Sequence, residues 1–196
     1  WKEKAVAPVT AMMTTGKPDT HAFIQGLWIL HRLHALPAGL LDNALQHSDP
    51  MVQVHAFRIL EETGNINEQQ RNVIIAATTN KNPHIQRMAA EILTRFTGID
   101  QLTPLLALYN QTGDADTHLK YTALLGIRDN LRNKQVMQQV ATRKWDDKQL
   151  EVLTKAMLDA PGQEAATFVL NYLRTHELPP PQLLASLEYI GRYGGA

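Results

Sequence analysis

The chain has 196 residues, of which 44% are hydrophobic, so it is long enough for one sizeable core or for an extended array of small units. Nineteen basic side chains balance nineteen acidic ones, and this zero net charge argues against nonspecific binding to nucleic acid or to a membrane surface as the main role. The lack of cysteine excludes disulfides, thiolate metal sites, a cysteine nucleophile and covalent haem attachment within these residues.

A first helix is expected over residues 6–15, ahead of a pattern that recurs along the chain. In this pattern a residue that can cap a helix stands directly before a proline, as in Asp49-Pro50 and Asn82-Pro83. The capping oxygen accepts a hydrogen bond from an otherwise unpaired backbone N–H, and proline at the first helical position has no N–H to leave unpaired. Asp19 and Asp116 predict two further helix starts of the same kind.

Apolar residues follow each start at the spacing of a helix. In the third unit they form one stripe, made of Ile85, Met88, Ala89, Ile92, Leu93 and Phe96. Alignment of the units makes four positions equivalent at intervals of 30 to 34 residues: Ala22, Val52, Ile85 and Leu119. The sequence therefore repeats one structural unit.

A second helix is expected after each first helix, at residues 36–45, 67–78, 100–110 and 133–142. Gly64, Gly98 and Gly113 follow predicted helix ends, where a glycine with left-handed backbone often caps the last turn. The sustained period-two alternation that is typical of strands does not occur in the sequence. Each unit is therefore predicted to be a pair of helices.

Two short amphipathic helices cannot bury their own apolar faces, whereas stacking the same pair beside itself buries one continuous core. We therefore predict an all-α fold, a right-handed α–α superhelix (HEAT/armadillo-like solenoid) with about four to five helix pairs. The predicted organisation is a single α-solenoid domain over residues 1–196. Residues 1–18 would form a leading cap, residues 19–142 the regular repeats and residues 143–196 irregular C-terminal helices.

The C-terminal helices are expected over residues 146–160, 163–175 and 180–192. Three prolines, Pro179–Pro181, stop one helix and start the next. Leu183, Leu187 and Ile190 share one face of the last helix and indicate its apolar side.

Four segments carry a resemblance to a known family. They are "GLWILHRLHAL" (26–36), "HSDPMVQVHAFRIL" (47–60), "PGQEAATFVLNYLRTHELPP" (161–180) and "LEYIGRYG" (187–194). These segments resemble the HEAT-repeat helical region of large secreted bacterial proteins, the membrane-bound dehydrogenase-like or haem-binding proteins of planctomycetes, verrucomicrobia and bacteroidetes. That family joins a sorbosone or glucose dehydrogenase-like β-propeller, a HEAT-repeat region and a C-terminal cytochrome c with a CxxCH haem motif.

The resemblance implies a periplasmic or extracellular location and a place within a longer parent protein, and a first residue other than methionine agrees with an excised piece. Neither the haem motif nor a propeller is present in these residues. The resemblance therefore transfers neither cofactor binding nor oxidation, and we expect no cofactor.

Two histidines are weak candidates for metal ligands, because His31 and His34 lie three residues apart on one predicted helix. His21 precedes them by ten residues, but no aspartate or glutamate occurs between Asp19 and Asp42 to complete a ligand set. The alternative interpretation is that both are polar positions at the end of a solenoid helix. We predict no metal site.

Basic residues concentrate between Lys120 and Lys148, a stretch with seven lysines and arginines and only three aspartates. The residues that could contribute to a binding surface are Arg128, Arg132, Arg143, Lys144 and Trp145. Such a surface could contact phosphate or nucleic acid, but the neutral chain as a whole disfavours nucleic acid. The alternative is a solvated helical face.

No catalytic motif is present, since the sequence lacks GxSxG, a phosphate-binding glycine loop and an acidic pair in a recognisable context. We predict a non-catalytic structural or protein-interaction solenoid, a spacer or docking module of a larger extracytoplasmic dehydrogenase-like protein. Its partners would be flanking domains of the parent chain or another protein, without a membrane partner. The alternatives are a free-standing peptide- or protein-binding scaffold and, with less support, a nucleic-acid-binding helical-repeat protein or an enzyme with a site on its concave face.

Overall fold

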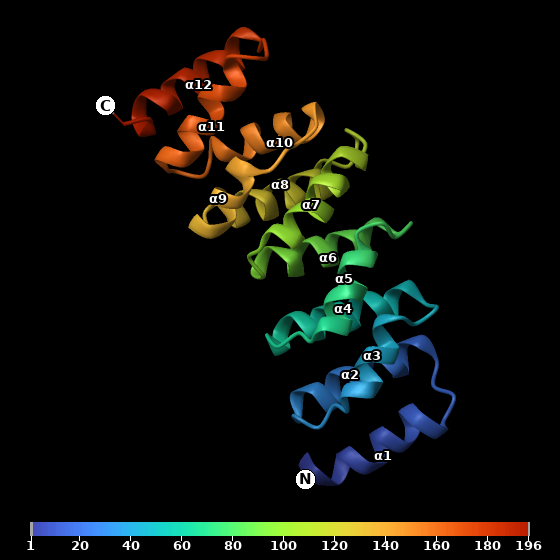
Figure 1. Cartoon of the computed structure of the whole chain (residues 1–196). Helices are drawn as coiled ribbons and strands as arrows, with labels where there is room; N and C mark the ends of the chain where they lie inside the picture. Colours follow the sequence, from blue (N-terminus) through green and yellow to red (C-terminus); the bar gives the residue numbers. More distant parts are fainter. Residues whose placement is uncertain (1, 196) are drawn as a thin grey trace. The chain divides into compact units, whose positions relative to one another are not determined.

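The computed structural model describes residues 2–195, and this part of the chain contains helices and no strand (Figure 1). The predicted all-α fold is confirmed. Twelve helices lie within the described residues: α1 (Lys2–Thr15), α2 (Thr20–Arg32), α3 (Ala38–Leu45), α4 (Pro50–Thr63), α5 (Glu68–Ala77), α6 (Pro83–Arg95), α7 (Ile99–Gln111), α8 (Thr117–Leu131), α9 (Lys134–Thr142), α10 (Asp147–Met157), α11 (Gln163–Leu173) and α12 (Pro180–Tyr193).

The chain divides into two compact units, Trp1–Ile92 and Leu93–Ala196, and the division falls within α6. In the first unit α1 packs against α2, α2 against α4, and α3 against α4. Contact between α2 and α4 means that each first helix lies beside the first helix of the next pair, as in a solenoid. Leu27, Leu30 and Phe57 are among its fully buried side chains.

The second unit repeats this arrangement from its own helices. Here α8 packs against both α7 and α10, while α9 packs against α11. Leu105, Ile127 and Leu153 are buried side chains of three of these helices. The last helix, α12, makes its main helix contact with α11.

The predicted helix starts are confirmed by hydrogen bonds. Asp49 Oδ1 accepts from Met51 N at 2.8 Å, and Asn82 Oδ1 accepts from His84 N at 2.9 Å. The side chains of Asp19 and Asp116 cap α2 and α8 in the same way. The capping residues therefore set where the first helices of the repeats begin.

Of the three predicted glycine caps, only Gly64 has left-handed backbone, with φ of 71° at the end of α4. The prediction was wrong for Gly98 and Gly113. Gly98 has extended backbone, with φ of 168°, because it stands before the first residue of α7. Gly113 is not among the glycines with positive φ.

The predicted apolar face of the last helix was also wrong in part. Leu183 and Leu187 of α12 are exposed, whereas Ser186 and Tyr189 are its buried residues. The prediction of a single domain with a leading cap, regular repeats and irregular C-terminal helices stays a prediction.

Asn130 connects the turn before α7 to α8. Its side chain is fully buried, accepts a hydrogen bond from Gly98 N at 2.9 Å and donates one to Gly126 O at 2.9 Å. Gly126 leaves room for this packing, because a Cβ there would lie 2.9 Å from Thr94 Cγ2 and 3.0 Å from Leu105 Cδ1. The buried amide therefore fixes the position of α8 against the preceding turn.

Replacement of Asn130 by alanine should lower the free energy of unfolding by about 2 kcal/mol, because the half-buried backbone N–H of Gly98 and the carbonyl of Gly126 both lose their hydrogen bond to its side chain. Denaturant unfolding followed by circular dichroism measures the change. Asn72→Ala is the control, since Asn72 is exposed on α5 and its replacement should change stability by less than about 0.5 kcal/mol. Equal effects of the two substitutions would contradict this role.

Candidate functional site

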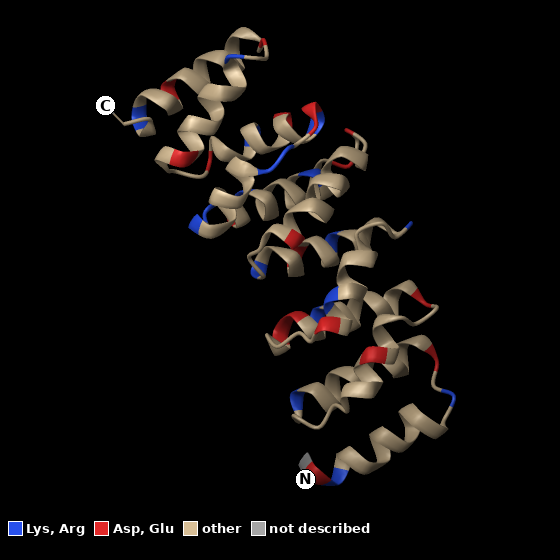
Figure 2. Ribbon diagram, viewed as in Figure 1, with Lys and Arg blue, Asp and Glu red and all other residues tan. Residues whose placement is uncertain are grey.

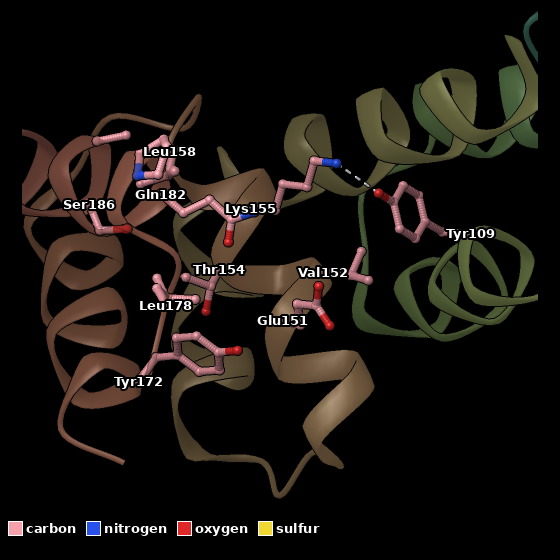
Figure 3. Close-up of a pocket in the computed structure, with 12 residues that line it drawn as sticks. Tyr109, Glu151, Val152, Thr154, Lys155, Leu158, Tyr172, Leu178, Gln182 and Ser186 are labelled. Atoms are coloured by element: carbon pink, nitrogen blue, oxygen red, sulfur yellow. Dashed lines mark hydrogen bonds between the residues drawn. The ribbon is translucent and has the colours of Figure 1, made fainter. Parts of the chain in front are cut away.

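A pocket of about 350 Å³ lies over α10 in the second unit (Figure 3). Its floor is one face of α10, and its walls come from α7, α11, the loop after α11 and α12. The lining residues are Tyr109, Glu151, Val152, Thr154, Lys155, Leu158, Tyr172, Leu178, Pro181, Gln182, Ala185 and Ser186. Apolar walls with a few polar groups are typical of binding pockets, and this volume is at the lower end of their usual range.

The sequence of α10 explains why its polar side chains share one face. A capping box formed by Asp146 and Gln149 starts the helix, with both reciprocal hydrogen bonds present. Positions three and four residues apart on a helix are neighbours, so Glu151, Thr154 and Lys155 line the same pocket. The opposite side of α10 is buried in the core.

The position of α12 explains why the pocket is open. Tyr189 Oη donates a hydrogen bond to Ala160 O at 2.6 Å, which ties the C-terminal half of α12 to the turn after α10. The N-terminal half begins after Pro179, which stands in extended backbone. Pro181, Gln182 and Ala185 from this half line the pocket. The space between α10 and the start of α12 is therefore left unfilled.

Two buried hydroxyl groups at the pocket have no hydrogen-bond partner among residues 2–195. Thr154 and Ser186 are 4% and 1% exposed, and their Oγ atoms are both unpaired. They project from α10 and α12 toward the space between these helices (Figure 3). A helical threonine commonly donates to a carbonyl one turn earlier, as Thr122 does to His118 O. An unpaired buried hydroxyl costs about 1–3 kcal/mol, so these two groups favour an occupant that pairs with them.

One wall of the pocket is held by a lysine–tyrosine pair. Lys155 Nζ donates to Tyr109 Oη at 2.9 Å and lies 5.6 Å from the centre of the Tyr109 ring (Figure 3). Lys120 Nζ lies 5.2 Å from the same ring and also donates to Asp114. The hydrogen bond with Asp114 raises the pKa of Lys120 above its ordinary value. Both ammonium groups are therefore already engaged with neighbouring side chains.

The remaining charged residue of the lining, Glu151, makes no hydrogen bond or ion pair within the described part of the chain. Its exposed carboxylate lies near Tyr172, whose pKa is raised above its ordinary value first by burial and then by the charges of Glu151 and Asp147. Tyr172 stacks on His176 with ring centres 4.2 Å apart. Glu151 is thus a carboxylate beside Tyr172 with no hydrogen bond or ion pair in the described residues, and its charge is also one cause of the raised pKa of Lys120.

The basic residues predicted as a binding surface lie in two groups of the second unit. Arg128 Nη2 is 2.7 Å and Arg132 Nη1 is 3.5 Å from Asp129 Oδ1, so one aspartate offsets both arginines. Arg143 lies 4.9 Å from the centre of the Trp145 ring, and Lys144 is exposed between them. Residues of both charge signs are interspersed along this part of the chain (Figure 2). A nucleic-acid role for these residues stays a prediction.

The two candidate histidines lie in the first unit and have different surroundings. His31 Nε2 is 3.0 Å from Glu62 Oε2, which also pairs with Arg32 Nη1 at 2.9 Å. The hydrogen bond from His31 is the main reason that the pKa of Glu62 is lowered. His34 follows the end of α2 with φ of 54°. Residues 2–195 contain no group of three histidine, aspartate or glutamate side chains that could hold a metal ion.

None of the sequence-based predictions pointed to the pocket over α10. One signal was available at Ser186, which falls between Leu183, Leu187 and Ile190 on the predicted apolar face of the last helix. A small polar residue within such a stripe departs from the pattern of a packed helix. Thr154 gives no comparable signal, because threonine is common on helix faces of either kind.

Comparison with known proteins agrees with the helical-repeat fold. Residues 37–124 match the family described as HEAT repeats. The chain is also similar to the crystal structure of an engineered protein from the Northeast Structural Genomics Consortium, with a TM-score of 0.52 and 12% identity over 96% of this chain and 95% of that chain. No curated protein matches the sequence.

The fold is thus that of an α-solenoid, and residues 37–124 are similar to HEAT repeats. This confirms the predicted HEAT-like helical region. Within residues 2–195, none of the helices has the length and apolar character needed to cross a membrane.

Replacement of Thr154 by valine should raise the free energy of unfolding by about 1 kcal/mol, because it removes an unpaired buried hydroxyl and keeps the shape of the side chain. The matched control is Thr78→Val. Thr78 is equally buried, but its hydroxyl donates to Ile75 O at 2.7 Å, so valine there should cost about 1 kcal/mol. Chemical denaturation measures both, and a loss of stability in T154V as large as in T78V would contradict the assignment.

Burial raises the pKa of Tyr189 to about 12, so the folded chain keeps the proton that anchors α12 while the unfolded chain releases it near pH 10. Stability from this group is full below pH 10 and falls as the pH rises from 10 toward 12. Tyr189→Phe should therefore lose less stability over this interval than the wild type, measured as the melting temperature against pH. Tyr121→Phe is the control, because Tyr121 is exposed and its replacement should leave the wild-type slope unchanged.

Proposed function

We propose that the chain is a non-catalytic scaffold that holds a protein partner on the surface formed by α10 and α12. The HEAT-repeat match and the solenoid fold support this class of function, because stacked helix pairs present extended surfaces for other chains. The partner is either a flanking domain of the same polypeptide or a separate protein.

The observation that carries the proposal is the exposed apolar surface of α12. Leu183, Leu184 and Leu187 are 38%, 60% and 52% exposed, and they follow one another within about one turn of the helix. Full burial of an exposed leucine side chain is favourable by roughly 1.5–3 kcal/mol. Because these three side chains are still partly exposed, a partner that covers them would gain part of this free energy. Clustered exposed apolar residues mark protein-interaction surfaces more often than isolated ones do.

The pocket over α10 lies beside this surface, since α12 lines it with Pro181, Gln182, Ala185 and Ser186. At about 3.6 residues per turn the exposed leucines point to a different side of α12 from Gln182 and Ala185, so a partner has to extend around the helix to contact both regions. In protein interfaces, anchoring side chains commonly fill small pockets within the contact.

A finer proposal concerns the parent protein. The four segments at residues 26–36, 47–60, 161–180 and 187–194 support a secreted bacterial dehydrogenase-like protein, in which this chain is a spacer or docking module outside the cytoplasm. A β-propeller or a CxxCH motif encoded in the same reading frame would support this parent. A reading frame with neither would contradict it and leave the free-standing scaffold.

The double substitution Leu184→Glu with Leu187→Glu should abolish partner binding, because two charges replace the apolar contact while both positions are exposed in the free chain. The measurement is cross-linking and mass spectrometry in an extract of the organism that encodes the chain. The control is Met51→Glu, an exposed apolar residue of the first unit. Circular dichroism should show wild-type helix content for both variants. Retention of the same partners by the double variant would contradict the proposal.

A further inference from the structure

We infer that the pocket over α10 binds a short peptide segment of the partner in which apolar side chains adjoin a basic residue. This inference rests on the proposed function, because it assumes that the surface of α10 and α12 holds a protein. It adds the chemistry of the segment that is recognised.

The unpaired hydroxyl groups favour a peptide over a purely hydrocarbon occupant. Thr154 and Ser186 can each donate and accept a hydrogen bond, and neither does so within residues 2–195. A peptide carries both N–H and C=O groups at every residue, so it can pair with both hydroxyls. A hydrocarbon would leave the two groups unpaired at the cost of their desolvation.

The apolar part of the segment is required by the walls. Val152, Leu158, Leu178, Pro181 and Ala185 line the pocket. A pocket of about 350 Å³ is small for a whole organic cofactor but suits the side chains of a peptide. The same helix, α12, carries the exposed leucines and lines the pocket, so a partner that extends around α12 would contact both.

The charge of the bound peptide is inferred from which charged groups at the pocket already have a partner. Lys155 donates to Tyr109 Oη, 2.9 Å away, and Lys120 pairs with Asp114, so both ammonium groups are directed at other side chains (Figure 3). Glu151 has no such partner in the described part of the chain. An arginine or lysine of the segment would pair with Glu151, and the nearby ring of Tyr172 also favours a cation.

Peptide binding to the full chain tests the inference. The probes are three fluorescein-labelled peptides: Gly-Ser-Leu-Leu-Arg-Ser-Gly, the same peptide with Glu for Arg, and the same peptide with Ser for both Leu. Fluorescence anisotropy at about 0.15 M salt limits nonspecific charge effects. The wild type should bind the Leu-Leu-Arg peptide about tenfold more tightly than either other peptide, because only that peptide supplies both parts of the contact.

Charge reversal gives the decisive comparison. Glu151→Lys should reverse the preference, so that the Leu-Leu-Glu peptide binds about tenfold more tightly than the Leu-Leu-Arg peptide. The matched control is Glu164→Lys, because Glu164 is exposed on α11 outside the pocket and its replacement should keep the wild-type preference. Both substitutions are at exposed positions, so neither should unfold the chain.

Three outcomes would overturn the inference: equal binding of the arginine and glutamate peptides by the wild type, no reversal in Glu151→Lys, or no binding of any probe. The proposed function is tested separately by the leucine variant of α12. If that variant loses its partner while the peptides show no charge preference, the scaffold role stands and only the basic segment is rejected.

Discussion

The structure depends on lateral burial of apolar helix faces. A pair of helices of about ten residues each exposes too much apolar surface to be stable alone, so each pair needs a neighbour to cover it. Contacts between α2 and α4 in the first unit and between α8 and α10 in the second unit supply this cover. The last helix, α12, packs mainly against α11 and has no following pair to cover its other faces. The pocket and the exposed leucines of α12 lie at this incompletely covered end.

Apolar burial has no direction, so it does not set how far one helix slides along the next. Hydrogen bonds between successive pairs do this. In the first unit Gln70 Nε2 donates to Asp42 Oδ1 at 2.7 Å, joining α5 to α3, and Trp28 Nε1 donates to His55 Nδ1 at 3.0 Å, joining α2 to α4. In the second unit Asn130 serves the same purpose between α8 and the turn at Gly98. Polar residues within the stack therefore fix the register that the apolar residues leave open.

Much of the fold could be predicted because its signals are local. Capping residues such as Asp49 and Asn82, followed by apolar residues at helical spacing, locate the first helices within a few positions. The hydrogen bond from Gly98 N to Asn130 could not be predicted, since the two residues are 32 positions apart. The pocket also depends on distant segments, because Thr154 and Ser186 meet the same space only after α12 has packed on α11. A sequence pattern cannot show which of two apolar faces a terminal helix will bury.

The bond between Trp28 and His55 makes the first unit sensitive to acid. Only a neutral imidazole can accept the indole N–H, and burial, with a smaller contribution from Arg58, already lowers the pKa of His55. Because the folded chain favours the neutral ring, this group stabilises it above the ordinary histidine pKa of about 6.5 and less as the pH falls. A scaffold that enters an acidic environment would therefore weaken first along the seam between α2 and α4, and the indole of Trp28 would report that loosening through its fluorescence.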